Sequence, residues 1–407
     1  MHRMHLIRRK LLLLALLVLA ALSPAHAGVA NAPGANLEVS LITYGPGETY
    51  WERFGHDAIE LRDTVSGEAV NFNYGVFDFS EKNFLLNFAR GRMHYLMDAA
   101  PSDADERYYV EAGRSITRQR LALTAEQATA LRDFLLWNLR PENAGYAYDY
   151  YVDNCTTRVR DALDKALGGM LATQLKAHAG DMTYRQQTVR LMSAQPWLML
   201  LLDLGLGPYA DQPLDAWQES FLPDVLQAQL REVRLDDGHG GRRPLVLVLD
   251  EQLVSPNRLQ APPPTAPDLR LPLALAGLLL AALIVLARRR WPAGYALLGT
   301  LYLLAAGVTG LLLLALWTLT THHSAWANAN LLLFNPLAFA LLPTLWRARR
   351  GLAASRFIDG VIALQLLACM AAVLLHLLPG TVQQNQPWLL FALPCWLALA
   401  WSLRRRQ

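Results

Sequence analysis

One cysteine stands alone in the first 368 residues, at what the pattern predicts is the start of a helix. Cys155 follows Asp153 and Asn154, two residue types that cap helix N-termini, and apolar residues at helical spacing continue to Gly168-Gly169. The positive end of a helix dipole favours a thiolate, the form in which cysteine attacks carbonyl carbons. The sequence therefore makes Cys155 a candidate nucleophile.

A thiol nucleophile needs a base, which in proteins is most often histidine. Residues 28–268 contain four histidines, His56, His94, His178 and His239. His178 and His239 lie in polar or glycine-rich segments typical of solvated surface, and His94 fits an ordinary strand residue. His56 begins an apolar strand directly after Gly55. We therefore favour His56 as the base.

The segment that contains His56 is predicted to be a β-hairpin. Residues 55–79 (GHDAIELRDTVSGEAVNFNYGVFDF) alternate between apolar and polar residues on both sides of Ser66-Gly67. A two-residue turn there would put Glu60 opposite Asn73 and Arg62 opposite Asn71. One face of the hairpin, opposite the core face, would then carry His56, Ala58, Glu60, Asn71 and Asn73.

The rest of the segment up to residue 260 mixes strands and helices, so we expect an α+β domain. Strand patterns occupy 91–99 and 114–123, helical patterns occupy 81–90, 181–230 and the residues after the capping Thr124, and a closing hairpin is expected over 231–250. The apolar stretch 197–207 is too short to cross a membrane. We expect it in the core, with contact to a membrane surface as the alternative.

Both ends of the chain carry membrane-directed patterns. Residues 1–27 combine a basic segment, an apolar core and an A-x-A motif ending at Ala27, the pattern of a cleaved signal peptide, with an uncleaved anchor as the alternative. The Pro-rich 261–268 reads as a linker between an exported catalytic domain, 28–260, and a transmembrane domain, 269–407. Five spans are predicted near 269–287, 294–318, 331–346, 358–378 and 388–403.

Basic residues predict the orientation of these spans. Arginines cluster at 288–290, 347–356 and 404–406, whereas the intervening 321–330 and 379–387 contain no Lys or Arg. Because basic segments stay in the cytoplasm, residues 28–268 are expected outside the inner membrane, in the periplasm, and the C-terminus in the cytoplasm. This agrees with the signal peptide.

The charge distribution excludes several functions. Residues 28–268 carry 22 basic and 33 acidic residues, which argues against nucleic-acid binding. The span region carries 11 arginines and a single acid, Asp359, and so lacks the ionisable groups of an ion or proton pathway. No phosphate-binding loop and no His or Cys pair with metal-ligand spacing occurs, so we expect no nucleotide, no metal and no cofactor.

An unpaired cysteine is unusual in an exported domain, where structural cysteines form disulfides in pairs. Cys369 and Cys395 lie inside the predicted spans and cannot serve as partners. Cys155 is therefore expected to be a reactive thiol or part of an intermolecular bridge, with a small buried core residue as the alternative.

A histidine on an early strand followed by a cysteine at a later helix start resembles the circularly permuted papain-like folds, which include NlpC/P60-related proteins. More specifically, the chain resembles the Lnb-type family of membrane proteins, the lyso-form lipoprotein transacylases. The matching stretches are FGHDAIEL (54–61), NFNYGVFDF (71–79), YDYYVDNCTTRVRDAL (148–163), LGLGPYADQPLDAWQESFLPDVL (204–226) and HHSAWANANLLLFNPLAF (322–339).

The resemblance implies that Cys155 is the nucleophile and His56 its base. The family's reaction would move an acyl chain from the glyceryl group of a lipoprotein to its N-terminal amine through a cysteine thioester. The backbone N–H of Cys155 would hold the oxyanion together with Asn73 or Tyr74. Asn71 or Asn73 could instead orient the histidine. A further candidate, Asn154, could simply cap the helix.

The outer loop 321–330 is expected on the same side of the membrane as the exported domain. His323, Asn328 and Asn330 are candidates for substrate contacts, or equally polar groups at the membrane interface. Asn335-Pro336, inside the third predicted span, should face protein or water.

Three alternatives to the transacylase remain open. A phospholipid could donate the acyl chain in place of a lipoprotein. A papain-like cysteine hydrolase of the cell envelope would use the same residues, although it would not need five spans. A non-catalytic membrane binding module would tolerate the loss of Cys155.

Overall fold

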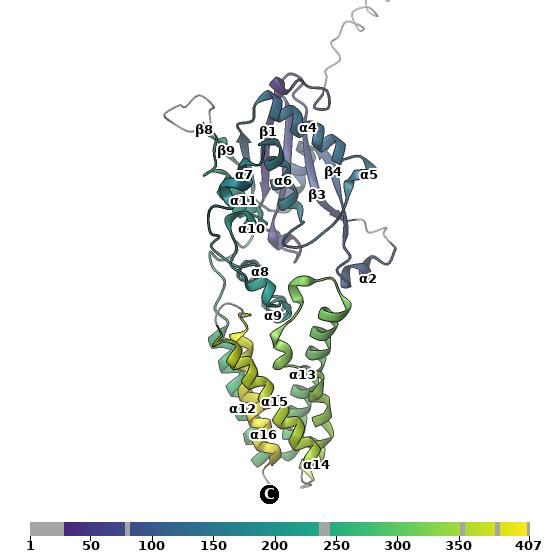
Figure 1. The fold of residues 1–407 in the computed structure, drawn as a ribbon, viewed down its shortest axis with the longest axis vertical. Helices are drawn as coiled ribbons and strands as arrows, with labels where there is room; N and C mark the ends of the chain where they lie inside the picture. The colour runs from purple at the N-terminus through teal and green to yellow at the C-terminus, as the bar shows by residue number, and fades with distance from the viewer. Residues whose placement is uncertain (1–27, 78–81, 236–244, 351–354, 379–382, 405–407) are drawn as a thin grey trace, which may run out of the picture.

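The computed structural model describes residues 28–77, 82–235, 245–350, 355–378 and 383–404 (Figure 1). The predicted signal peptide, His239 and most of the last arginine cluster lie outside the described residues. An α/β domain stands at one end of a helical bundle, and the C-terminus lies at the other end of that bundle (Figure 1).

A seven-stranded antiparallel sheet forms the centre of the first domain. Its strands, in the order β6-β4-β3-β2-β1-β5-β9, are β6 (Gly145–Ala147), β4 (His94–Pro101), β3 (Ala69–Phe77), β2 (His56–Asp63), β1 (Leu37–Tyr44), β5 (Ile116–Leu121) and β9 (Val248–Ser255). The predicted strands around residues 56–63, 69–77, 91–99 and 114–123 are confirmed. Of the predicted closing hairpin, the described residues show the pair of β7 (Arg234–Leu235) with β8 (Leu245–Val246), and the apolar run continues into β9.

The hairpin of β2 and β3 has the predicted faces but a different register. Glu60 pairs with Asn71 and Ala58 pairs with Asn73, a shift of two residues from the expected pairing. The connection is longer than two residues because Asp63 accepts hydrogen bonds from the Val65 backbone and the Ser66 hydroxyl. A shift of two leaves every side chain on its original face, since strand side chains alternate with a period of two.

Helices cover both faces of the sheet. One face packs against α4 (Ala125–Asn138), α6 (Cys155–Ala166), α7 (Met170–Leu175) and α11 (Pro223–Leu230) in a shared apolar core. The opposite face carries Ile42, Tyr44 and Ala58, which pack against Tyr109 and Val110 of α3 (Ser102–Glu111). Because successive residues of β2 face opposite sides, His56 lies on the α3 side and Asp57 on the α6 side.

Short elements connect these layers to each other and to the membrane domain. They are η1 (Gly34–Asn36), η2 (Glu52–Phe54), α2 (Phe84–Ala89), α5 (Pro141–Ala144), α8 (Tyr184–Met192), α9 (Pro196–Gly205), η3 (Pro208–Asp211) and α10 (Ala216–Glu219). The apolar stretch expected in the core forms α9, whose residues meet both domains. Leu200 and Leu204 pack against the membrane bundle, whereas Trp197 is 66% exposed.

Five segments of the described residues are long and apolar enough to cross a membrane. Four are continuous helices, α12 (Arg270–Arg290), α13 (Pro292–Leu319), α15 (Arg356–Leu375) and α16 (Gln386–Arg404). The third contains the predicted span near 331–346 and is divided into η4 (His323–Ala325), η5 (Ala329–Leu332), η6 (Pro336–Leu341) and α14 (Leu342–Arg349).

The break in the third segment is compensated by polar side chains. Pro336 supplies no backbone N–H, and the Asn335 side chain instead accepts a hydrogen bond from the Leu337 backbone. Asn335 also donates to Gln365 of α15 at 2.6 Å, and Gln365 donates to the free Leu332 carbonyl. These polar groups therefore face protein, as expected for a membrane interior.

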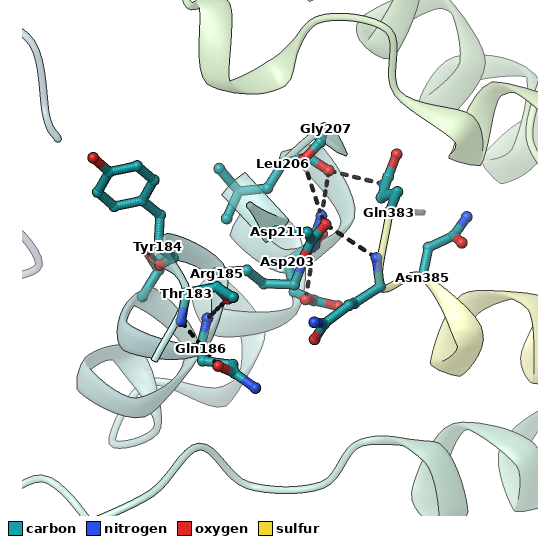
Figure 2. Close-up of polar contacts among 12 residues, drawn as sticks. Thr183, Tyr184, Arg185, Gln186, Asp203, Leu206, Gly207, Asp211, Gln383 and Asn385 are labelled. Atoms are coloured by element: carbon teal, nitrogen blue, oxygen red, sulfur yellow. Dashed lines mark hydrogen bonds and ion pairs between the residues drawn. The ribbon is translucent and has the colours of Figure 1, made fainter. Parts of the chain in front are cut away.

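A buried arginine joins α8 to the segments that contact the membrane domain (Figure 2). Arg185 donates to both carboxylate oxygens of Asp211 at 2.7 and 2.9 Å and to Asp203 at 3.0 Å. Asp211 accepts a hydrogen bond from the Gln384 backbone, and Asp203 accepts one from the Trp388 indole of α16. One guanidinium thus organises two carboxylates that hold the membrane domain.

Arg185→Ala is expected to lower the free energy of unfolding by about 3–5 kcal/mol, because it leaves two buried carboxylates without a cation. Arg231→Ala is the matched control, since its pair with Glu251 is largely solvent-exposed and such pairs contribute about 0–1 kcal/mol. Thermal unfolding in detergent compares the two. Equal shifts in the melting midpoint would contradict the assignment of Arg185 as the organising residue.

Candidate active site

Asn154 caps the helix that carries Cys155. Its side chain accepts a hydrogen bond from the Thr157 backbone at 2.9 Å, and the Thr157 hydroxyl accepts one from the Asn154 backbone at 2.7 Å. The Asn154 amide also donates to the carbonyls of Tyr150 and Phe221. These bonds engage the side chain of Asn154 in fixing the start of α6, which corresponds to the simple capping role.

A β-bulge at Gly75 lets the start of α6 approach the sheet. The β3–β4 register shifts between Tyr74 and Val76, and Gly75 adopts φ +93°, a conformation that favours glycine. A Cβ on Gly75 would lie 3.6 Å from the Cβ of Cys155. Cys155, at the start of α6, therefore lies beside the bulge of β3.

Burial keeps the Cys155 thiol protonated. Burial raises the pKa of the thiol above its ordinary value of 9.0, while hydrogen bonds from the Thr156 side chain and from the backbone N–H of Asp57 act in the opposite direction. Burial therefore opposes the preference of a helix start for the thiolate.

Asn73 orients the His56 ring. The Asn73 amide nitrogen donates to Asp105 of α3 at 2.9 Å, so its oxygen faces His56 Nε2 at 3.0 Å. Nε2 then carries the proton and Nδ1 keeps a free lone pair, the state required of a base. Among the described residues no hydrogen bond joins His56 to Cys155, whose sulfur contacts Thr156 and the residue after His56.

The surroundings keep His56 neutral. Its ring stacks on Tyr44 and Tyr109 with centroids 5.9 and 6.2 Å away. Burial lowers the pKa of His56 below its ordinary value of 6.5, and the nearby Arg114 acts in the same direction, against the hydrogen bond to Asn73. Both members of the pair are therefore neutral near pH 7, an arrangement suited to general-base activation of the thiol.

The other two candidates on β3, Asn71 and Tyr74, form hydrogen bonds with residues other than His56 and Cys155. Asn71 is buried and donates to the Tyr44 hydroxyl and to Asp105, so it supports the groups around His56 without touching the ring. The Tyr74 hydroxyl donates to Asn138 of α4 at 2.8 Å, inside the apolar core. Its proton is used there, so the structure does not support Tyr74 as an oxyanion donor.

Sequence reasoning missed an acid beside Cys155, the candidate nucleophile. Asp57 is fully buried on the α6 side of β2 and accepts a hydrogen bond from the Thr43 hydroxyl at 2.8 Å. Burial, and then the charge of a Cys155 thiolate, raise the pKa of Asp57 to about 8. The sequence could have indicated Asp57, because a charged residue at a position on the core face of an apolar strand is unusual. Asp105 gave no such signal, because it lies on the unpredicted helix α3.

The outer loop of the membrane domain contacts the segment just before Cys155. His323 lies 3.2 Å from the Asp149 carboxylate, and the His322 ring stacks on Tyr150 at 5.9 Å. Thr321 donates to the Arg90 carbonyl. The candidate site therefore adjoins the outer end of the bundle.

Asn328 and Asn330 have a different environment from the expected substrate contacts. They are 2% and 0% exposed, and their amides donate to the carbonyls that end α9, including that of Leu204. Gln383 and Asn385 of the last outer segment complete this network, with Gln383 also donating to Leu206 (Figure 2). These amides join the two domains.

Two further histidines of the first domain lie within the described residues. His94 and His178 are exposed. Within the described ranges, no group of three or more His, Cys, Asp or Glu side chains could hold a metal ion.

Comparison with known families divides the chain in the same two parts. Residues 26–195 match the Lnb N-terminal periplasmic domain, and residues 266–403 match the Lnb transmembrane domain. No curated protein and no solved structure matches the chain.

Gly75→Ala is expected to cost about 1–3 kcal/mol of stability through backbone strain, and to slow alkylation of Cys155 by iodoacetamide because the new methyl group fills the space beside the thiol. Gly67→Ala is the matched control. Gly67 also has a positive φ, of +79°, but no atom lies within 4 Å of its Cβ position. Equal alkylation rates in the two variants would contradict the role of Gly75.

The alkylation rate of Cys155 should rise with pH through neutrality and still be rising at pH 9, because the reactive thiolate forms only as pH passes the raised pKa of the thiol. A plateau from acidic pH onwards would instead reveal a resting thiolate–imidazolium pair.

Asp57→Asn should increase the alkylation rate of Cys155 above about pH 8, since it removes a second negative charge beside the sulfur.

Proposed function

This chain belongs to the Lnb-type family of inner-membrane proteins with a periplasmic N-terminal domain, and on that premise we propose that it is a cysteine acyltransferase. Its substrate would be a lipoprotein with an acylated glyceryl group, and its product the lyso form with an acylated N-terminal amine. The observation that carries the proposal is a capped cysteine beside a strand whose histidine is already oriented by Asn73. We further propose that the C-terminus is cytoplasmic.

The order of the two catalytic groups supports a permuted papain-like relation. His56 begins a central strand, and Cys155 begins a helix that packs on that sheet later in the chain. Asn73 holds the far nitrogen of the ring, as a third residue does in cysteine enzymes of the papain type. These three residues would then form the catalytic group.

Formation of a thioester is the first step. His56 Nδ1 takes the thiol proton as the Cys155 sulfur attacks the ester carbonyl, which gives a tetrahedral oxyanion. When this intermediate collapses, the bond between the acyl carbon and the glyceryl oxygen breaks. The leaving glyceryl oxygen takes the proton from His56, and the acyl chain remains on the sulfur.

Transfer to the amine is the second step. The free N-terminal amine of the lipoprotein attacks the thioester, and His56 accepts one of its protons. The carbon–sulfur bond then breaks, and the proton returns to the sulfur of Cys155. The net change converts an ester and an amine into an alcohol and an amide, which is favourable and needs no nucleotide.

The position of the site supports a lipid substrate. The segment before Cys155 contacts the outer loop through Asp149–His323 and Tyr150–His322. The buried hydrogen bonds and ion pairs around Arg185, Asn328 and Gln383 connect the periplasmic domain to the outer end of the membrane domain. A site at that boundary is within reach of an ester whose chains remain in the outer leaflet.

The test is tandem mass spectrometry of a diacylglyceryl lipopeptide incubated with the purified full-length protein in detergent. The expected product has an unchanged total mass, with one chain on the N-terminal amine and a lyso glyceryl group. Cys155→Ser should abolish it, and His56→Ala should slow it by about 10²–10⁴-fold, the usual contribution of a general base. Asn73→Ala should slow it less, since the ring remains.

The other outcomes separate the alternatives. A gain of one chain when phospholipid is present would indicate a phospholipid donor. Loss of a chain or of a peptide fragment would indicate a hydrolase. Unchanged product in Cys155→Ser would contradict a cysteine mechanism altogether.

A further inference from the structure

One hydroxyl beside the candidate site has no partner. Tyr146 lies on β6, is 7% exposed, and its buried oxygen makes no hydrogen bond among the described residues. A buried polar group left unsatisfied typically costs about 1–3 kcal/mol, so such groups call for an explanation. The neighbouring Tyr74, by contrast, satisfies its hydroxyl through Asn138.

The Tyr146 ring is held in place from several sides. Its strand pairs with β4 through Tyr95, and its ring meets the edge of Tyr74 with centroids 6.2 Å apart. The Arg158 guanidinium lies 4.3 Å from the ring centroid. Arg158 is in turn paired with Asp153, just before the α6 cap. The hydroxyl therefore has a fixed position with respect to the start of α6.

That position adjoins the nucleophile. The Tyr146 oxygen lies 3.8 Å from the point where a Gly75 Cβ would stand, and the Cys155 Cβ lies 3.6 Å from the same point. Gly75 has no side chain, so the hydroxyl and the cysteine face the same small gap. A carbonyl under attack by the sulfur would occupy space next to that gap.

The phenol remains a hydrogen-bond donor while the sulfur reacts. Burial, and then the charge of a Cys155 thiolate, raise the pKa of Tyr146 far above its ordinary value of 10.0, and Arg158 only partly opposes this. The O–H therefore stays intact at every pH at which the protein is folded and active. It can stabilise a developing negative charge without transferring its proton.

We propose that Tyr146 is a catalytic residue whose hydroxyl donates a hydrogen bond to the oxyanion formed when Cys155 attacks an acyl ester. The backbone N–H groups at the start of α6 have no partners within the helix and supply the second donor. The role rests on the proposed acyltransferase function, and it replaces Tyr74 as the side-chain donor. The hydroxyl stays unpaired at rest because its partner arrives with the substrate.

The test uses Tyr146→Phe in the full-length protein, with p-nitrophenyl octanoate as an acyl donor that needs no lipoprotein. The burst of nitrophenolate measures acylation of Cys155 and should slow by about 10²-fold, the usual effect of losing one oxyanion donor. Alkylation by iodoacetamide should be unchanged, because that reaction forms no oxyanion. The melting midpoint should not fall, since only an unsatisfied hydroxyl is removed.

Tyr95→Phe is the matched control, because it removes a hydroxyl from the cross-strand neighbour of Tyr146. It should leave the burst unchanged. An unchanged burst in Tyr146→Phe would overturn the inference. Equal losses of acylation and alkylation with a lowered melting midpoint would also overturn it, in favour of a structural role.

The same assay separates this inference from the proposed function. A burst in the unsubstituted protein that depends on Tyr146, without any transfer to the lipopeptide amine, would support the oxyanion role and reject the transacylase. Absence of a burst at Cys155 in the unsubstituted protein would reject both.

Discussion

The close approach of a helix start to a sheet is the constraint on which the rest of this structure depends. Cys155 lies beside the end of the β2–β3 hairpin, where Gly75 forms a bulge with a positive φ. The Asn154–Thr157 cap fixes the first turn of the helix at that point. Cys155 and the Tyr146 hydroxyl, which makes no hydrogen bond among the described residues, then face one small gap beside Gly75.

The electrostatics of the site follow from the partial burial of Cys155 and His56 and the full burial of Asp57. Desolvation raises the pKa values of Cys155 and Asp57 and lowers that of His56, so each group tends toward its neutral form. A neutral site suits a substrate whose reacting ester is itself uncharged. In the proposed reaction, charge would appear only as His56 takes the thiol proton and the oxyanion forms, where preorganised donors act most strongly in a low dielectric.

Two polar networks place that site with respect to the membrane. Arg185 binds Asp203 and Asp211, which in turn accept hydrogen bonds from the segment that leads into α16. Asparagine and glutamine amides of the outer loops bind the free carbonyls at the end of α9. Because these groups are buried and mutually satisfied, the two domains form one unit.

The sequence by itself indicated Cys155 and His56 as candidates for a catalytic pair, and it determined the faces of the hairpin and the five apolar segments. Cys155 and His56 could be selected by residue type. The faces of the hairpin were predicted correctly despite a register shift of two residues, because strand side chains alternate between the two faces. Only the tertiary structure decided which neighbours act on the pair. The Asn73 oxygen lies 3.0 Å from His56 Nε2, whereas Asn71 donates to Tyr44 and Asp105. Tyr74 donates to Asn138, and the Tyr146 hydroxyl has no hydrogen-bond partner among the described residues. Those partners lie on elements that are distant in the sequence. The spacing of residues within one segment does not predict which distant side chains contact it or how far they are buried.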